Sequence, residues 1–261
     1  VLAFKASDSP LHPQPAFFRS EDEIDQLIYN GLCANNLARY LTRLPKQTKL
    51  AVVARGCETR SVNALIVESQ KKREDLFLIG VPCEGIIDWR KIIGHTGENS
   101  QFEAENEDQV RVRAGDSIFS LARADLLHES CRRCVHRNPI SADIVIGEPV
   151  QEQGPENQED FVNGFRAKTL EERYRYFQQE AERCIRCYAC REACPMCYCA
   201  ECFVDHIAPR WTESGATPAG TQGWHIVRAF HQAGRCTSCG ACERACPMDI
   251  KMTWMTEKLN R

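Results

Sequence analysis

One stretch of this chain reads Cys184-Ile185-Arg186-Cys187-Tyr188-Ala189-Cys190-Arg191-Glu192-Ala193-Cys194-Pro195, and a second reads Cys236-Thr237-Ser238-Cys239-Gly240-Ala241-Cys242-Glu243-Arg244-Ala245-Cys246-Pro247. Both follow the pattern C-x2-C-x2-C-x3-C-P. These stretches, here called the first run and the second run, hold eight of the sixteen cysteines in the 261-residue chain. A spacing that occurs twice with the same ending predicts two equivalent thiol sites.

This spacing is typical of a ferredoxin module with two 4Fe-4S clusters, in which the fourth cysteine of each run ligates the cluster of the other run. The predicted ligands are therefore Cys184, Cys187, Cys190 and Cys246 for one cluster, and Cys236, Cys239, Cys242 and Cys194 for the second. A disulfide framework and two zinc sites are the alternatives. Zinc motifs usually pair two C-x2-C units instead of chaining three cysteines.

Helices are predicted directly before both runs. Thr169 to Arg183 begins with a capping box formed by Thr169 and Glu172, and Trp224 to Ala233 is closed by Gly234. The sequence therefore predicts a mainly helical dicluster ferredoxin domain over residues 167–261, not the compact βαβ type. The segment before it, residues 148–166, begins with a stretch rich in Glu, Gln, Pro and Gly and is predicted to be a linker.

Residues 1–147 are predicted to form an α/β domain with a small parallel sheet. Two short apolar segments separated by a helix make a βαβ unit, whose strands run parallel. A third strand is expected to join them. The predicted strands are Lys49 to Ala54, Leu76 to Val81 and Ala142 to Ile146, and the predicted helices are Ser20 to Leu44, Ser61 to Gln70 and Ser117 to Glu129. Residues 98–109 are acidic and polar, and a surface loop is expected there.

Four further cysteines belong to this N-terminal region. Cys57 and Cys83 follow the first and second predicted strands, so they share the carboxyl edge where parallel sheets place their sites. Cys131 and Cys134 form a C-x2-C pair before the third strand. We predict that these four thiols hold a third 4Fe-4S cluster, with a structural zinc or buried free thiols as the alternatives.

The last four cysteines are less clearly patterned. Cys197, Cys199 and Cys202 follow the first run immediately and are candidates for a further metal site, zinc or a cluster, with His206 or a distant thiol as the fourth ligand. The alternative is that they pack around the first cluster. Cys33 lies in an apolar segment and is predicted to be a core residue.

Charge and hydropathy exclude several classes of protein. With 33 basic and 36 acidic residues and no basic stripe, nothing indicates a nucleic-acid partner. The apolar segments are far shorter than the ~18 residues of a membrane span. Cysteines in cluster spacing without an export signal indicate a reducing cytoplasm, and oxygen-sensitive clusters suggest an anaerobic host.

Four short motifs together resemble the beta subunits of hydrogenases and formate dehydrogenases that reduce a deazaflavin coenzyme. The motifs are Arg55-Gly56-Cys57-Glu58, Ile79-Gly80-Val81-Pro82-Cys83-Glu84-Gly85, Cys131-Arg132-Arg133-Cys134 and Ala142-Asp143-Ile144-Val145-Ile146-Gly147. The match is similar to the C-terminal domain of that family, and the dicluster module that follows resembles the formate dehydrogenase branch. The resemblance implies that electrons pass through the clusters from a catalytic subunit and leave by way of FAD to a soluble acceptor.

The sequence therefore predicts an iron–sulfur electron-transfer subunit of a soluble multi-subunit oxidoreductase. Its expected partners are a catalytic subunit and another redox subunit or acceptor. The family segment that precedes this domain and helps to bind flavin is expected to be absent or reduced here, which favours a relay of clusters alone. A flavin-dependent reductase that binds FAD and a zinc-stapled scaffold are the alternative functions.

Overall fold

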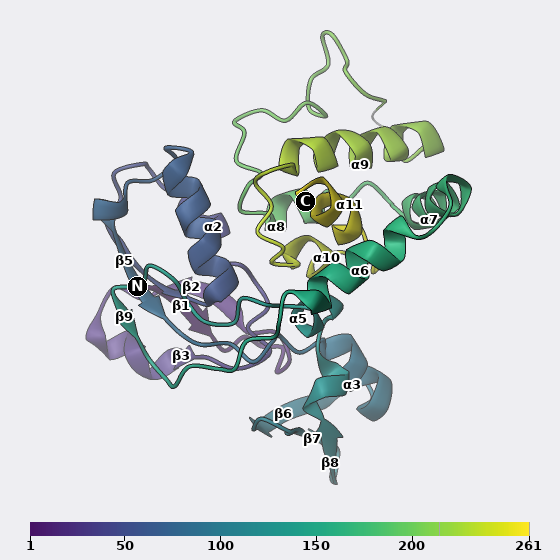
Figure 1. Ribbon diagram of the computed structural model, residues 1–261. Helices are drawn as coiled ribbons and strands as arrows, with labels where there is room; N and C mark the ends of the chain where they lie inside the picture. Colours follow the sequence, from purple (N-terminus) through teal and green to yellow (C-terminus); the bar gives the residue numbers. More distant parts are fainter. Residues whose placement is uncertain (214, 261) are drawn as a thin grey trace.

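The computed structural model describes residues 1–213 and 215–260 of the chain (Figure 1). Its N-terminal half is built on a six-stranded sheet with the order β2-β1-β4-β5-β9, in which β3 also pairs with β1. The strands are β1 (Leu2–Lys5), β2 (Gln14–Phe17), β3 (Leu27–Ile28), β4 (Leu50–Ala54), β5 (Leu76–Gly80) and β9 (Ile144–Val145). β4 runs parallel to β5, and β5 runs parallel to β9. The predicted parallel sheet is therefore confirmed.

The βαβ unit forms because its strands and its helix share one apolar core. Helix α2 (Gly56–Val67) connects β4 to β5, with the short 3-10 helix η2 (Arg73–Asp75) before β5. Val52, Leu65 and Leu78 are completely buried in this core. Burial of side chains of this size contributes roughly 1.5–3 kcal/mol each, so the unit holds the strand ends that carry Cys57 and Cys83 in fixed places.

The single helix predicted from Ser20 to Leu44 is wrong. The segment contains the 3-10 helix η1 (Glu21–Gln26), then β3, and only four residues of helix in α1 (Ala38–Leu41). Asparagines explain the break, because Asn30 Oδ1 accepts from Leu32 N at 3.0 Å and Asn36 Oδ1 accepts from Ala38 N at 3.0 Å. Such side-chain bonds compete with helical ones. A capping box of Ser20 and Glu23 begins η1 instead.

A second, antiparallel sheet occupies the region predicted as an acidic loop and a helix. It consists of β6 (Ser100–Glu105), β7 (Gln109–Ala114) and β8 (Ser117–Ala122) in that order. In β7 the buried Val110 and Val112 alternate with exposed polar residues, which is the period of a strand with one buried face. The sheet packs on α3 (Trp89–Thr96), and α4 (Arg123–Leu126) and α5 (Glu129–Arg132) lead back to the main sheet.

The C-terminal half is helical and forms the green and yellow part of Figure 1. Its helices are α6 (Glu156–Arg166), α7 (Leu170–Glu182), α8 (Ala189–Ala193), α9 (Pro218–Gln232), α10 (Ala241–Arg244) and α11 (Thr253–Leu259). The predicted helices before both runs are present as α7 and α9. α9 begins six residues earlier than predicted, because Thr217 Oγ1 accepts from Gly220 N at 3.2 Å and proline stands at the first helical position.

Helix α6 lies within the segment predicted as a linker. Its Phe165 is buried and stacks on Trp254 of α11, with ring centroids 4.0 Å apart. An aromatic pair of this kind contributes about 0.5–1.5 kcal/mol beyond the free energy gained from the apolar area that it buries. The end of the range 148–166 is thus packed on α11, while the linker and the domain ranges 1–147 and 167–261 stay a prediction. In the described part of the chain, no helix is long and apolar enough to cross a membrane.

The second run lies against the N-terminal half. Ser61 of α2 and Thr237 share a hydrogen bond of 2.9 Å between their hydroxyls. Arg244 Nε donates to the carbonyl oxygen of Ala34 at 2.9 Å, and Arg90 Nη2 donates to that of Cys246 at 2.8 Å. These contacts place the cysteines of the second run beside those of the parallel sheet.

Candidate metal centres

The two runs fold into the same turn. Arg186 and Ser238 occupy equivalent positions and both have left-handed backbone angles, with φ of 57° and 53°. In each turn the backbone N–H of that residue donates to the sulfur of the first cysteine, from Arg186 to Cys184 and from Ser238 to Cys236, both at 3.4 Å. Hydrogen bonds to ligand sulfurs are among the factors that set cluster potentials. The repeated spacing therefore encodes a repeated thiol-presenting turn.

The structure brings the predicted ligands of the first run together around one cavity, here called the first cavity. Three of its thiols come from the first run and one from the end of the second run, so the lining includes Cys184, Cys187, Cys190 and Cys246. Phe177, Ile250 and Met252 form an apolar cluster against which Cys184 and Cys246 pack. That cluster holds the ends of the two runs in contact, as cross-ligation requires. Ligation itself stays a prediction.

A second cavity has the reciprocal lining. It is bordered by Cys194, from the end of the first run, and by Cys236, Cys239 and Cys242. Met196, two residues after Cys194, is buried in the core of the N-terminal half. This contact fixes Cys194 on the side of the second run. The arrangement agrees with the second predicted ligand set.

The remaining predicted set, Cys57, Cys83, Cys131 and Cys134, lines a third cavity at the carboxyl edge of the parallel sheet. The segment between Cys134 and β9 returns to this edge, since Cys83 N donates to the carbonyl oxygen of Arg137 at 3.0 Å. Gly85 N also donates to Cys83 Sγ at 3.4 Å. The four thiols are thus close in space despite the long sequence separation between them.

The three cavities follow one another through shared walls. Cys242 borders both the first and the second cavity, and Cys239 borders both the second and the third. The close approach of the second run to the third cavity depends on Gly240, which has a φ of 69°. A Cβ added there would lie 2.0 Å from Ser130 Oγ. The N-terminal and C-terminal thiol sites therefore form one continuous series.

Buried polar groups around the cavities fit anionic clusters. His225 Nε2 at the first cavity, Arg228 Nε between the first and second, and Arg137 Nε at the third have no hydrogen-bond partner within residues 1–213 and 215–260. A buried donor without a partner is costly, and the sulfides of a cluster are acceptors that would satisfy the two arginine N–H groups and the Nε2–H tautomer of His225. Burial lowers the pKa of His225 to about 4, so its ring is neutral at pH 7.

Arg228 is the central charge of this region. It is 6 % exposed, and its Nη2 donates to the carbonyl oxygen of Cys190 at 3.3 Å. Burial acts to lower the pKa of Arg228, but negative charge on the sulfurs of Cys242 and Cys190 acts in the opposite direction and would hold that pKa well above its usual range. A guanidinium kept charged between two sites suits thiolate-bound clusters, whose net charge is negative.

Most of the candidate ligand cysteines are half-buried. Burial raises the pKa of Cys134 and of Cys236 to about 11, and it also raises the pKa of Cys190. Without a metal these groups are therefore protonated at neutral pH, and iron binding must displace their protons. No three or more His, Cys, Asp or Glu side chains of the described residues are placed to hold a single metal ion. A 4Fe-4S cube spreads its four thiolates more widely.

The other cysteines occupy two different environments. Cys33 is completely buried in the apolar core of the N-terminal half, though in a turn and not in the predicted helix. Cys197, Cys199 and Cys202 all line a separate and larger cavity beside the second one. His206 does not line this cavity; its Nδ1 lies 3.6 Å from Glu201 Oε1.

Sequence reasoning missed Arg228, His225 and Gln232, which all lie on α9 and border the cavities. None of these three residues falls in a sequence pattern that is typical of metal or cluster ligands. One signal was present, because Arg228 stands in an otherwise apolar stretch of α9 with Ile226 and Phe230. A lone cation in such a stretch indicates a buried charge with a partner to neutralise it.

Comparison with known proteins agrees with this arrangement. Residues 47–163 match the family described as the C terminus of the beta subunit of coenzyme F420 hydrogenase/dehydrogenase. Residues 180–250 match the 4Fe-4S dicluster domain. The chain therefore carries a region similar to the C terminus of the F420 hydrogenase/dehydrogenase beta subunit, followed by a 4Fe-4S dicluster domain. The resemblance stated from the sequence is thereby confirmed, and a dicluster domain implies two 4Fe-4S clusters.

Two curated relatives cover most of the chain. The F420-dependent formate dehydrogenase subunit beta of Methanocaldococcus jannaschii is 25% identical over 322 aligned positions, covering 99% of this chain and 83% of the relative. The F420-dependent formate dehydrogenase 1 subunit beta of Methanococcus maripaludis is 23% identical, covering 89% of this chain and 76% of the relative. Both relatives are beta subunits of formate dehydrogenases.

Proposed function

We propose that this chain is the electron-transfer subunit of a multi-subunit oxidoreductase of the formate dehydrogenase type. It relays electrons one at a time between a catalytic subunit and a second redox partner. The observation that supports this is the series of three cavities, each lined by at least four cysteines, in which neighbouring cavities share a cysteine. Clusters in neighbouring cavities would share a cysteine-lined wall, as a relay of one-electron carriers requires.

Each cavity would hold one 4Fe-4S cluster. Cys184, Cys187, Cys190 and Cys246 ligate the first cluster, Cys236, Cys239, Cys242 and Cys194 the second, and Cys57, Cys83, Cys131 and Cys134 the third. The clusters supply the redox chemistry, and the protein sets their spacing, their burial and the donors around them. The relatives' names suggest a deazaflavin coenzyme as the acceptor at one end of the relay.

Native purification tests the partner half of this proposal. The tagged chain, isolated from its own host under nitrogen, is expected to bring with it a catalytic oxidoreductase subunit, identified by mass spectrometry. A tag expressed alone is the control. Recovery of the chain as a monomer from native extract contradicts the proposal.

Cofactor analysis of the isolated chain tests the other half. We expect a brown protein whose visible spectrum bleaches on reduction and which converts no organic substrate by itself. Flavin released on denaturation favours instead a flavin-dependent iron–sulfur reductase acting on a soluble coenzyme. Stoichiometric zinc with no acid-labile sulfide indicates the zinc-stapled scaffold and contradicts the proposed electron relay.

A further inference from the structure

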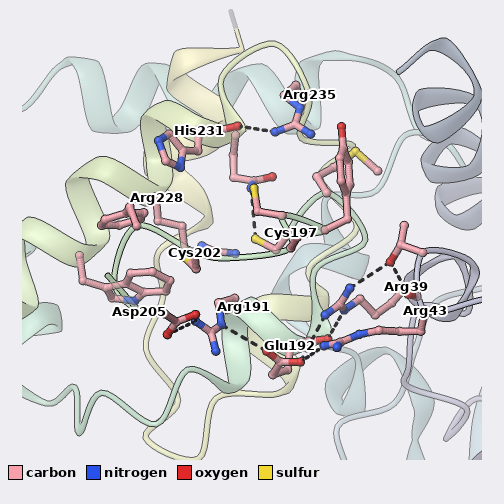
Figure 2. Close-up of a pocket in the computed structure, with 18 residues that line it drawn as sticks. Arg39, Arg43, Arg191, Glu192, Cys197, Cys202, Asp205, Arg228, His231 and Arg235 are labelled. Carbon is pink, nitrogen blue, oxygen red and sulfur yellow. Dashed lines mark hydrogen bonds and ion pairs between the residues drawn. The ribbon is translucent and has the colours of Figure 1, made fainter. Parts of the chain in front are cut away.

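A fourth cavity, here called the basic cavity, has a volume of about 570 Å³ and is drawn in Figure 2. It lies between α9, the segment that follows the first run, and α1. The thiols of Cys197, Cys199 and Cys202 are on its wall. None of the three cavities described above is lined by these cysteines.

The basic cavity is built for an anion. Five arginines border it, namely Arg39, Arg43, Arg191, Arg228 and Arg235. Glu192 forms ion pairs with both Arg39 and Arg43, and Asp205 Oδ2 lies 2.9 Å from Arg191 Nη1 (Figure 2). Arg235 Nη2 lies 2.7 Å from Glu68 Oε2, so three carboxylates face the five arginines. Arg228 has no carboxylate partner within hydrogen-bond reach in the described structure, and its Nε makes no hydrogen bond there. The cavity therefore carries excess positive charge, part of it buried.

The segment that supplies the three cysteines is irregular and is anchored by single side chains, such as Met196 in the N-terminal core and Phe203 on Trp224. From the end of α8 at Ala193 to the start of α9 at Pro218, its described residues form no helix or strand. Ile207 and Trp211 are 81% and 65% exposed, so they contribute no core. Irregular segments of this length are uncommon in compact domains and are usually functional. A bound metal centre would order the segment through its ligands.

Gln232 connects the basic cavity to the second one. This side chain is 2 % exposed, its Nε2 donates to Cys197 Sγ at 3.4 Å, and its Oε1 accepts from Cys194 Sγ at 3.5 Å. Met196 and Arg228 also border both cavities. A redox centre held by Cys197 would thus be the direct neighbour of the cluster that Cys194 is predicted to ligate.

We propose that the basic cavity binds a fourth 4Fe-4S cluster through Cys197, Cys199 and Cys202. This inference rests on the proposed relay, to which it adds a second branch beside the second cluster. Three thiolates select a metal centre over an organic anion, and the arginines compensate the negative charge of a thiolate-bound cluster. His231, on the same wall, replaces His206 as the candidate fourth ligand.

The test is iron and sulfide analysis of the full chain after anaerobic reconstitution. Wild type is expected to hold about sixteen irons, and the variant Cys197→Ser/Cys199→Ser/Cys202→Ser about twelve. Cys33→Ser, at a buried cysteine away from every cavity, should match wild type. Equal iron in wild type and the triple variant overturns the proposal, as does the loss of one zinc in place of four irons. A wild-type iron content below twelve per chain contradicts the relay of three clusters. The difference in iron content between wild type and the triple variant tests the fourth cluster alone.

Alkylation provides a measurement that needs no variant. Cys199 is exposed, so as a free thiol it should react quickly with iodoacetamide under native conditions. We expect Cys197, Cys199 and Cys202 to be protected in the loaded chain and to become labelled after iron is removed by a chelator. Cys33 should stay unlabelled until the protein is unfolded. Labelling of Cys199 in a chain with its full iron content overturns the proposal.

Discussion

The two runs have the same spacing and the same left-handed turn, yet their surroundings differ. The first run is at the outer side of the series, where Cys187 and the neighbouring Ile185 are exposed. The second run is pressed against the N-terminal half, with Gly240 close to Ser130 and Cys239 on the wall of the third cavity. One local sequence pattern thus gives a terminal site in one place and a bridging site in the other, and the packing around each turn decides which.

The largest expected effects come from replacing the fourth cysteine of each run, Cys194 or Cys246, by serine. In a chain whose second cluster is already removed by Cys236→Ser/Cys239→Ser, Cys194→Ser should cause no further loss of iron. Cys246→Ser in the same background should remove about four more irons, because it belongs to the first cavity. Iron and sulfide analysis of the reconstituted variants measures this. The opposite pattern would show that each run ligates its own cluster.

Gly240→Ala is expected to damage the bridging site strongly. The left-handed backbone costs a residue with a Cβ about 1–2 kcal/mol, and the added Cβ would meet Ser130 Oγ at 2.0 Å. Denaturant unfolding of the loaded chain should show a loss of more than that backbone cost, together with less iron in the third site.

Two further variants sharpen this expectation. Ser130→Gly removes the two nearest atoms that the new Cβ would meet, so it should restore part of the stability lost in Gly240→Ala. At the equivalent position of the first run, Tyr188 already has a φ of 60° with a side chain present. Tyr188→Ala should therefore carry no comparable backbone penalty. Failure of Ser130→Gly to restore any stability in the Gly240→Ala background would show that the contact with Ser130 is unimportant.

Arg228→Gln should affect both runs together, by a smaller amount. Removing a buried cation beside clusters that gain negative charge on reduction lowers their reduction potentials. A unit charge at about 10 Å in an effective dielectric of about 20 is worth ~1.7 kcal/mol, or on the order of 50–100 mV for one electron. Redox titration followed by electron paramagnetic resonance measures the shift. Arg175→Gln, on the exposed face of α7, is the control, and equal potentials in both variants would remove Arg228 as a tuning charge.

The contrast between the runs also shows what the sequence could predict. Cysteine spacing is a local property, so it predicted the turns and the reciprocal grouping of thiols around the first and second cavities. Strand ends fall at one edge of a parallel sheet, so Cys57 and Cys83 could be paired. The position of Gly240 against Ser130 could not be predicted, because it depends on how the two halves pack.

The errors have physical causes as well. Val110 and Val112 alternate with charged residues, a strand pattern hidden in a polar region, and the segment from Ser20 to Leu44 is interrupted by asparagines that bond to their own backbone. The basic cavity is assembled from arginines distant in sequence. Only the structure shows that Arg39 and Arg235 face the cysteines behind the first run.

The smallest expected effect concerns the ion pair that links Arg235, between α9 and the second run, to the end of α2. Arg235 Nη2 lies 2.7 Å from Glu68 Oε2, and the Tyr198 hydroxyl donates to the same carboxylate. The hydrogen bond from Arg235 is the main reason that the pKa of Glu68 is below its usual 4.5. A depressed pKa in the folded state contributes stability above pH 4.5, and that contribution disappears as the pH falls through the folded-state value.

Glu68→Gln should therefore lower the free energy of unfolding by about 0.2–1 kcal/mol at pH 7, the range for partly exposed pairs. The difference from wild type should shrink on acidification towards and below the folded-state pKa, where the wild-type carboxylate also becomes neutral. Urea titrations at several pH values measure it, with Glu171→Gln, part of an exposed pair with Arg175 on α7, as the control. A difference that stays constant down to low pH would show that Glu68 acts through packing and not through its charge. The ion pair with Arg235 would then not stabilise the second run against α2.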